Sequence, residues 1–160
     1  MIGLFVVEHL PAWATNRLSR LTVTPKRHLV DPALMGPLLG VDERAVRRDV
    51  DLLGRIIESF VVSQLRAELA VCRGAPRLFH LRQKNGRHEV DLLAEFPNGG
   101  VIAIEVKAHA APDRGMAVHL LWLQEELGDR FLAGIVFHTG PRAFPLAEAI
   151  HALPICAIWG

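Results

Sequence analysis

The segment from residue 88 to residue 107 reads HEVDLLAEFPNGGVIAIEVK and contains two β-strand patterns on either side of a turn. Residues 101–107 place alternate side chains in two sets, which is the period of a strand, and residues 88–95 form a second such run. Residues 97–100, with the sequence PNGG, are typical of a turn. The segment therefore predicts a hairpin of two antiparallel strands.

Upstream of this hairpin, the sequence predicts a long helix and then a third strand. Apolar residues recur at three- and four-residue steps from about Asp49 to Val71, which is the pattern of a helix with one wide apolar face. Residues 77–83 again have the period of a strand. The dipeptide Asn85-Gly86 predicts a tight turn from that strand into the hairpin.

Downstream of the hairpin, the sequence predicts a crossover connection. We expect a helix over 115–127, an apolar strand over 131–138, a short helix over 146–152 and a final strand over 155–159. A meander followed by a helical crossover implies an α/β fold, with a mixed central β-sheet flanked by helices.

The first part of the chain contains short extended pieces rather than a long element. These pieces are residues 4–7, 21–23 and 28–30. Asp31 before Pro32 has the form of a helix N-cap and predicts a short helix over 33–39, and Asp42 predicts the cap of another.

Composition limits the classes of protein to which the chain can belong. Of its 160 residues, 51% are hydrophobic and 22% are charged, which is the balance of one folded domain. Two cysteines exclude a disulfide framework, and the longest apolar run, residues 131–137, is too short for a membrane helix. Because the start also lacks the basic region of a signal peptide, we expect a cytoplasmic protein with no membrane partner.

Charge is spread unevenly along the chain, although the net charge of +1 excludes a polybasic nucleic-acid coat. Residues 66–87 hold six basic residues and one acidic residue, whereas residues 89–129 hold eight acidic and two basic residues. This pattern suits a metal site beside a polyanion-binding surface, and it equally suits ordinary solvated charge. The candidate phosphate-binding residues are Arg66, Arg73, Arg77 and Arg82.

The hairpin carries the residues with the clearest chemistry. Glu105 and Lys107 share a face of one predicted strand, as do Glu89 and Asp91 on the other. If the two strands pair in register, we expect Asp91, Glu105 and Lys107 to lie on one face of the sheet. Carboxylates gathered in this way suit Mg²⁺ or Mn²⁺, and such an ion can activate water against a phosphodiester.

The preceding helix adds a fourth candidate. Glu58 lies beside the apolar face of the helix and is expected to point toward the same carboxylates. Gly54, one turn earlier, predicts the close approach of another element.

This pattern resembles the active-site signature of the PD-(D/E)XK nuclease superfamily, in which an acidic residue precedes Glu/Asp-x-Lys across a hairpin. The resemblance implies a restriction-endonuclease-like fold and DNA cleavage with Mg²⁺ or Mn²⁺. Asp91 and Glu105 would bind the metal together with the backbone carbonyl of Val106. Lys107 would act on the attacking water, and Glu58 would hold a metal-bound water or a second ion.

The chain also resembles the uncharacterised C-terminal domain that follows an AAA+-type ATPase module in bacterial and archaeal proteins. The resemblance rests on LGRIIESFV at 53–61, EVD at 89–91, IEVKA at 104–108 and the end of the chain. It implies that residues 1–31 are the remnant of a winged-helix or linker region, which packs loosely on a nuclease-like domain at 32–160 or depends on a partner. The absence of GxxxxGK[ST] excludes the ATPase itself.

Two functions stay open at this point. The first is a metal-dependent DNA-binding endonuclease, and the second is an inactive nuclease-fold module that binds DNA or a partner and regulates an ATPase. In the second case Lys107 forms a structural ion pair with Glu58 or Asp91 and no metal is needed. DNA is the partner that the first function requires, and an ATPase module, another protein or a second copy of this chain are the alternatives.

Overall fold

The structure is a computed structural model that describes residues 6–15, 20, 23–83 and 86–160. The strands are β1 (Val7–Leu10), β2 (Lys26–Leu29), β3 (Arg77–Arg82), β4 (Glu89–Glu95), β5 (Val101–Lys107), β6 (Phe131–His138), β7 (Phe144–Ala147) and β8 (Ile150–Pro154). The α-helices are α1 (Met35–Leu39), α2 (Glu43–Arg48), α3 (Val50–Ala70) and α4 (Val118–Leu127). Short 3-10 turns cover Pro32–Leu34, Arg114–Ala117, Gly128–Arg130 and Ile155–Trp159.

Six of these strands form one mixed sheet in the order β3-β4-β5-β6-β8-β7, and β1 and β2 form a separate two-stranded sheet. The meander β3-β4-β5 is antiparallel, whereas β6 lies parallel to β5 after the crossover through α4. The α/β class with a mixed sheet is therefore confirmed, and β5 and β6 have the predicted bounds.

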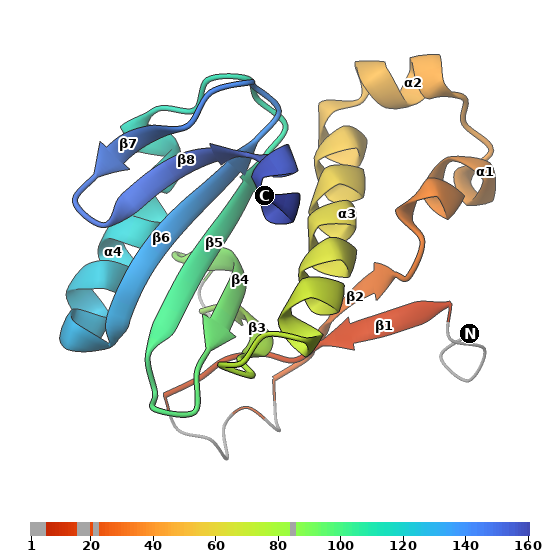
Figure 1. Ribbon diagram of the computed structural model, residues 1–160. Helices are drawn as coiled ribbons and strands as arrows, with labels where there is room; N and C mark the ends of the chain where they lie inside the picture. The colour runs from red at the N-terminus through yellow and green to blue at the C-terminus, as the bar shows by residue number, and fades with distance from the viewer. Residues whose placement is uncertain (1–5, 16–19, 21–22, 84–85) are drawn as a thin grey trace.

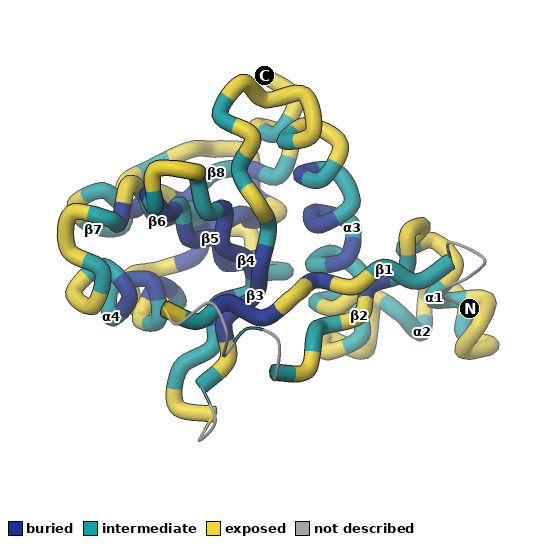
Figure 2. Tube along the Cα trace, turned by 90° about the horizontal axis from the view of Figure 1, so that it is seen from below, coloured by how far each residue is buried: buried dark blue, intermediate teal, exposed yellow. Residues whose placement is uncertain are grey.

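The sheet lies between two helices, with α3 on one face and α4 on the other (Figure 1). Each face has its own group of buried side chains. The α3-side core consists of Leu10, Val61, Val62, Leu65, Leu92, Ile104 and Phe137. The α4-side core includes Trp13, Phe79, Leu81, Val90, Leu93, Val101, Ala103, Leu120, Leu123 and Val136. Figure 2 shows the buried chain concentrated in the central strands and along α3, whereas α1 and α2 are mostly exposed.

The C-terminal part differs from the sequence-based prediction. The prediction of a helix over 146–152 is wrong, because β7 and β8 form an antiparallel hairpin there. The final strand lies at Ile150–Pro154, and residues 155–159 form a 3-10 turn instead. The reason is the turn at Ala149, whose backbone takes a positive φ of 57° and sends the chain back along the sheet.

The N-terminal segment is packed into the domain, which contradicts the expected loose packing. Leu10 is fully buried in the α3-side core, and Trp13 lies in the α4-side core. The backbone N–H of His80 donates to the Pro11 carbonyl at 2.9 Å, and the His80 carbonyl accepts from the Trp13 N–H at 2.7 Å. The division into domains at residue 31 and the winged-helix origin of residues 1–31 both stay predictions.

Some predicted elements fall on residues that lie outside the described part of the chain. These are Leu4 and Phe5 of the first expected strand, Leu21 and Thr22 of the second, and Asn85 of the turn.

A substitution at Leu10 measures how far the first strand belongs to the core. Leu10→Ala should lower the free energy of unfolding by about 2–5 kcal/mol, because it leaves a cavity against α3. Leu39→Ala is the matched control, since this leucine is 60% exposed and its loss should change little. Urea unfolding compares the two variants, and equal small losses would show that β1 adds nothing to the core.

Candidate functional site

The position of Asp91 is set by an irregularity in the pairing of β3 with β4. Phe79 pairs with Leu93 and Leu81 pairs with Val90, so two residues of β4, Asp91 and Leu92, lie opposite one residue of β3. An extra residue of this kind is a β-bulge, which re-aims the side chains on the bulged strand. The bulge arises where His80 directs its backbone hydrogen bonds to the N-terminal segment.

Regular alternation from Leu92, which faces α3, would place Asp91 on the α4 side of the sheet. The bulge turns Asp91 toward α3 instead. Val90 packs in the α4-side core and Leu92 in the α3-side core, although the two residues are two positions apart. The Oδ2 atom of Asp91 accepts the Val106 N–H at 3.0 Å, and Oδ1 lies 3.4 Å from the Lys26 ammonium on the α3 side. The Asp91 carboxylate therefore lies between the two strands and faces α3.

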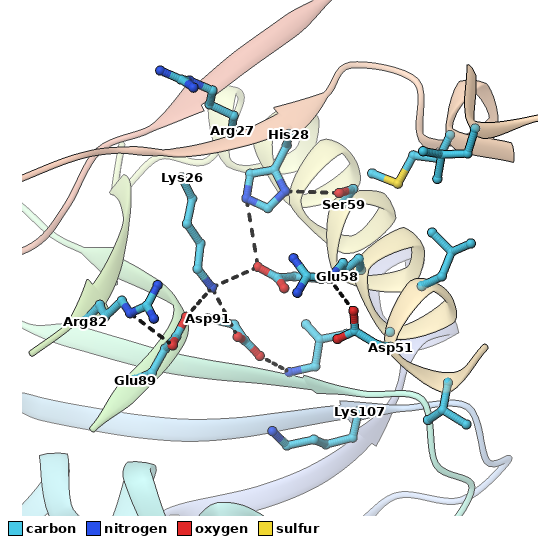
Figure 3. Close-up of a pocket in the computed structure, with 17 residues that line it drawn as sticks. Lys26, Arg27, His28, Asp51, Glu58, Ser59, Arg82, Glu89, Asp91 and Lys107 are labelled. Atoms are coloured by element: carbon cyan, nitrogen blue, oxygen red, sulfur yellow. Dashed lines mark hydrogen bonds and ion pairs between the residues drawn. The ribbon is translucent and has the colours of Figure 1, made fainter. Parts of the chain in front are cut away.

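Lys26 lies at the centre of the acidic residues (Figure 3). Its Nζ is 3.1 Å from Glu58 on α3, 3.1 Å from Glu89 on β4 and 3.4 Å from Asp91. The side chains of Lys26 and Glu58 are each only 20% exposed. Three carboxylates from two elements thus share one ammonium group, and we name these four side chains the Lys26 cluster.

The charges of the Lys26 cluster depend on one another. Burial alone would lower the pKa of Lys26, but the carboxylates of Asp91, Glu58 and Glu89 outweigh it and raise this pKa. Burial and the charge of Asp91 raise the pKa of Glu58, while Lys26 opposes that change. The ammonium of Lys26 therefore offsets part of the rise in the pKa of Glu58 that burial and the charge of Asp91 cause.

His28 borders the cluster from the same strand as Lys26. Its Nδ1 lies 3.1 Å from the Ser59 hydroxyl, and its Nε2 lies 3.9 Å from Glu58 Oε1. Burial and the nearby charge of Lys26 lower the pKa of His28 to about 4, so the ring is neutral at pH 7.

Glu105 and Lys107 form a separate pair. Strand alternation places them with Ala103, which packs in the α4-side core, whereas Ile104 and Val106 pack on the α3 side. Lys107 Nζ lies 2.6 Å from Glu105 Oε2, and the buried Oε1 has no hydrogen-bond partner. Alternation therefore assigns Glu105 and Lys107 to the α4 side of β5, whereas the Asp91 carboxylate lies toward α3. Lys107 nevertheless borders the same cavity as Asp91, and the charge of Asp91 acts on Glu105, so the expected gathering of the three side chains stays a prediction.

The environment of Glu105 disfavours its charge. The residue is 2% exposed, and burial followed by the charge of Asp91 raises its pKa to about 8, although Lys107 acts in the opposite direction. Burial would lower the pKa of Lys107, but the carboxylate of Glu105 raises it. Asp91 is thus close enough for its charge to act on Glu105 even though they bind different lysines.

This raised pKa predicts a pH-dependent stability. Folding favours the protonated form of Glu105. The contribution of this group to the free energy of unfolding is therefore complete below its ordinary pKa of 4.5 and is lost as the pH rises toward about 8. The stability of wild type relative to Glu105→Gln should therefore fall by about 1 kcal/mol per pH unit across that range.

Urea unfolding between these two pH values measures the effect. The test is the slope with pH of the difference in free energy of unfolding between wild type and Glu105→Gln. The size of that difference is not the test, because Lys107 loses its partner in Glu105→Gln at every pH. Glu125→Gln, an exposed change on α4, should show no such slope relative to wild type. A difference between wild type and Glu105→Gln that stays constant with pH would contradict the raised pKa.

The Lys26 cluster opens into a cavity of about 730 Å³ between α3, β2 and the ends of β4 and β5. Lys107 and Val106 line this cavity together with Glu58 and Asp91, so four of the five predicted site residues border one space. Three further basic residues also line it, namely Arg27, Arg55 and Arg82. The cavity therefore has an acidic centre and basic side chains around it.

The predicted phosphate-binding arginines are not gathered at this cavity. Only Arg82 lines it, where its Nε lies 3.7 Å from Glu89. Arg66 instead bonds the His9 carbonyl and Glu8 of β1, and the guanidinium of Arg77 lies over the Phe79 ring. Arg73 is exposed beyond the C-terminal end of α3, whereas the cavity borders the N-terminal half.

Gly54 has a different role from the one expected. A Cβ atom built on it would meet nothing within 4 Å, so no element packs closely there. Gly54 lines the cavity instead, and because it has no side chain it leaves this part of the cavity unfilled.

The donor set suits a hard cation, but lysine ammonium groups already pair with these carboxylates. Among the described residues, no group of three His, Cys, Asp or Glu side chains is placed to hold a metal ion as it stands. The ammonium of Lys26 occupies the point on which Glu58, Glu89 and Asp91 converge. The unpartnered Oε1 of Glu105 is a further oxygen available to a cation. These residues fit Mg²⁺ or Mn²⁺ if Lys26 moves.

The places of Lys26 and His28 at the site were not predicted from the sequence. Both lie on the same face of β2, and their i, i+2 spacing is the one local signal that they act together. Nothing in the spacing relates them to Asp91, which follows 65 residues later.

The fold and the cavity define an α/β domain with a carboxylate-lined pocket where two central strands part. The chain belongs to the family described as domain of unknown function DUF4143, whose model matches residues 53–158. It is 29% identical over 150 residues to two curated relatives, uncharacterized protein Rv2008c of Mycobacterium tuberculosis and uncharacterized protein Mb2031c of Mycobacterium bovis.

The match covers 93% of this chain and 32% of each relative, so the chain spans about a third of their length. No solved structure matches the chain. Within the described residues, no helix has the length and apolar character needed to cross a membrane.

Proposed function

We propose that this domain is a metal-dependent, DNA-binding phosphodiesterase with a restriction-endonuclease-like, PD-(D/E)XK fold. The observation that carries the proposal is the convergence of Glu58, Glu89 and Asp91 on one point, the Lys26 ammonium, in an open cavity. The order of α3, the β3-β4-β5 meander, α4 and β6 supports it, because this is the order that the nuclease resemblance implies.

Each of the site residues has a role in this proposal. Asp91 and Glu105 hold the metal ion, with the backbone carbonyl of Val106 as a third oxygen. Bound Mg²⁺ or Mn²⁺ supplies charge neutralisation and lowers the pKa of water. Lys107 orients the attacking water and stabilises negative charge in the transition state, and Glu58 holds a second water or ion.

The basic residues around the cavity support DNA as the substrate. Arg27, Arg55 and Arg82 surround the acidic centre, and arginines placed in this way contact phosphates without reading sequence. The acidic centre disfavours binding of DNA without a cation, so we expect DNA binding in the cavity to be stronger with Mg²⁺ or Ca²⁺ present.

A second function is supported by a specific observation. Lys26 and Lys107 already form ion pairs with the carboxylates, so the fold is held together at this site without any metal. In that case it is an inactive nuclease-fold module that binds DNA or a partner protein. Since the curated relatives are about three times as long as this chain, an ATPase module in a longer protein is the partner we favour for it.

A plasmid-nicking assay separates the two functions. Supercoiled plasmid should be nicked by the purified domain with Mn²⁺ or Mg²⁺ and left intact with EDTA. Glu125→Gln should nick like wild type, because this exposed residue lies on α4 outside the cavity lining. If neither metal supports nicking at any protein concentration that binds DNA, the inactive module is the correct function.

A further inference from the structure

Lys26 is the one member of its cluster that neither the fold of the sheet nor the expected chemistry accounts for. It lies on β2, in the N-terminal two-stranded sheet, and its backbone is held opposite Leu10 of β1. Its side chain leaves that sheet and ends among carboxylates that belong to α3 and β4. A lysine placed in this way adds a cation to the site from a separate part of the fold.

The cluster has more negative than positive charge. One ammonium faces three carboxylates at 3.1–3.4 Å, and the side chains of Lys26, Glu58 and Asp91 are all at most 20% exposed. A monovalent ammonium cannot neutralise three carboxylates, whereas a divalent ion in its place would leave a smaller residual charge. The ammonium and a divalent ion cannot occupy the same point.

We propose that Lys26 is a built-in counter-ion of the carboxylate cluster, and that a divalent cation binds there by displacing its ammonium group. The inference rests on the proposed function in one respect, which is that the cluster accepts Mg²⁺ or Mn²⁺. It goes beyond that function because it makes Lys26 a determinant of metal affinity. The displaced side chain stays tethered at the cavity, where its charge is available to a phosphate oxygen.

Two consequences separate this role from a purely structural one. A structural lysine would be needed in every state, so its removal would weaken metal binding together with the fold. A competing lysine opposes the metal, so its removal weakens the metal-free protein but strengthens metal binding. The sign of the change in metal affinity therefore decides between them.

The test is a titration of Mn²⁺ followed by electron paramagnetic resonance at low salt and constant pH. Lys26→Met removes the charge and keeps most of the stem, and it should bind Mn²⁺ about tenfold more tightly or better. Lys26→Arg keeps the positive charge and should bind no more tightly than wild type. Arg44→Met, which removes an exposed charge from α2, is the control for a change in net charge.

Folding is monitored in the same samples by circular dichroism. If Lys26→Met is unfolded alone and folds on addition of Mn²⁺, the proposal is supported, because the metal then replaces the missing counter-ion. Weaker or unchanged Mn²⁺ binding by folded Lys26→Met overturns it, as does tighter binding by Lys26→Arg.

Failure of this inference differs from failure of the proposed function. Tighter Mn²⁺ binding by Lys26→Met without any plasmid nicking supports Lys26 as a counter-ion and removes the nuclease. Nicking by wild type with weaker metal binding by Lys26→Met keeps the nuclease and overturns the counter-ion. If neither wild type nor Lys26→Met binds Mn²⁺, both are overturned.

Discussion

Asp91→Asn is expected to reduce metal-dependent plasmid nicking by about a hundredfold or more. Asparagine has the shape of aspartate, and its amide oxygen can still accept the Val106 N–H that Asp91 accepts at 3.0 Å. It lacks the negative charge that a divalent ion requires. The substitution therefore removes the proposed metal ligand and preserves the link between β4 and β5.

The same variant should lose the stabilisation that metal gives the folded protein. Mn²⁺ should raise the melting temperature of wild type, because a ligand that binds only the folded state stabilises it. In Asp91→Asn this rise should be absent, while circular dichroism shows a folded domain. An unchanged nicking rate in Asp91→Asn would mean that the activity comes from another site or from a contaminant.

Lys107→Met is expected to abolish nicking to a similar degree but to leave metal binding intact or tighter. The ammonium of Lys107 lies 2.6 Å from Glu105, and its removal frees that carboxylate for a cation. The attacking water then lacks the group that positions it, so cleavage is lost at the chemical step.

The contrast between the two variants gives this prediction its specificity. Both should fail to nick plasmid, but only Lys107→Met should keep the rise in melting temperature with Mn²⁺. Loss of the rise in both variants would make Lys107 a structural residue of the Glu105 pair. Wild-type nicking by Lys107→Met would remove it from the reaction altogether.

Much of the central fold could be predicted from local sequence. The period of two over residues 101–107 and the buried run over 131–138 gave the bounds of β5 and β6. The apolar repeat from Asp49 to Val71 gave α3 within one residue at each end. These elements are long and strongly periodic, so tertiary contacts do not override their local preference.

The C-terminal hairpin was missed because its signal is short. Leu146 to Ala152 has enough apolar spacing for a helical turn, yet Ile150 and Ala152 are buried on alternate positions of β8. The parallel pairing with β6 and the turn at Ala149 decide the outcome, and neither is visible in the local pattern.

The site could be predicted in composition but not in geometry. Asp91, Glu105, Lys107 and Glu58 all lie at or beside one cavity, as their types suggested. The pairing of Asp91 with Lys26 and of Glu105 with Lys107 could not be predicted, because the position of Asp91 depends on a bulge in β4 that follows from the hydrogen bonds of His80 with distant residues. Lys26 reaches Asp91 across 65 residues of sequence, and no short motif encodes that contact.

The most direct test of the account is a crystal structure with Mn²⁺, in which anomalous scattering locates the ion. We expect an ion at about 2.1 Å from a carboxylate oxygen of Asp91, with the Lys26 ammonium moved away from the cluster. A structure with no ion at Asp91, in which Lys26 keeps its ion pairs with Glu58, Glu89 and Asp91, would contradict a metal site in this cavity.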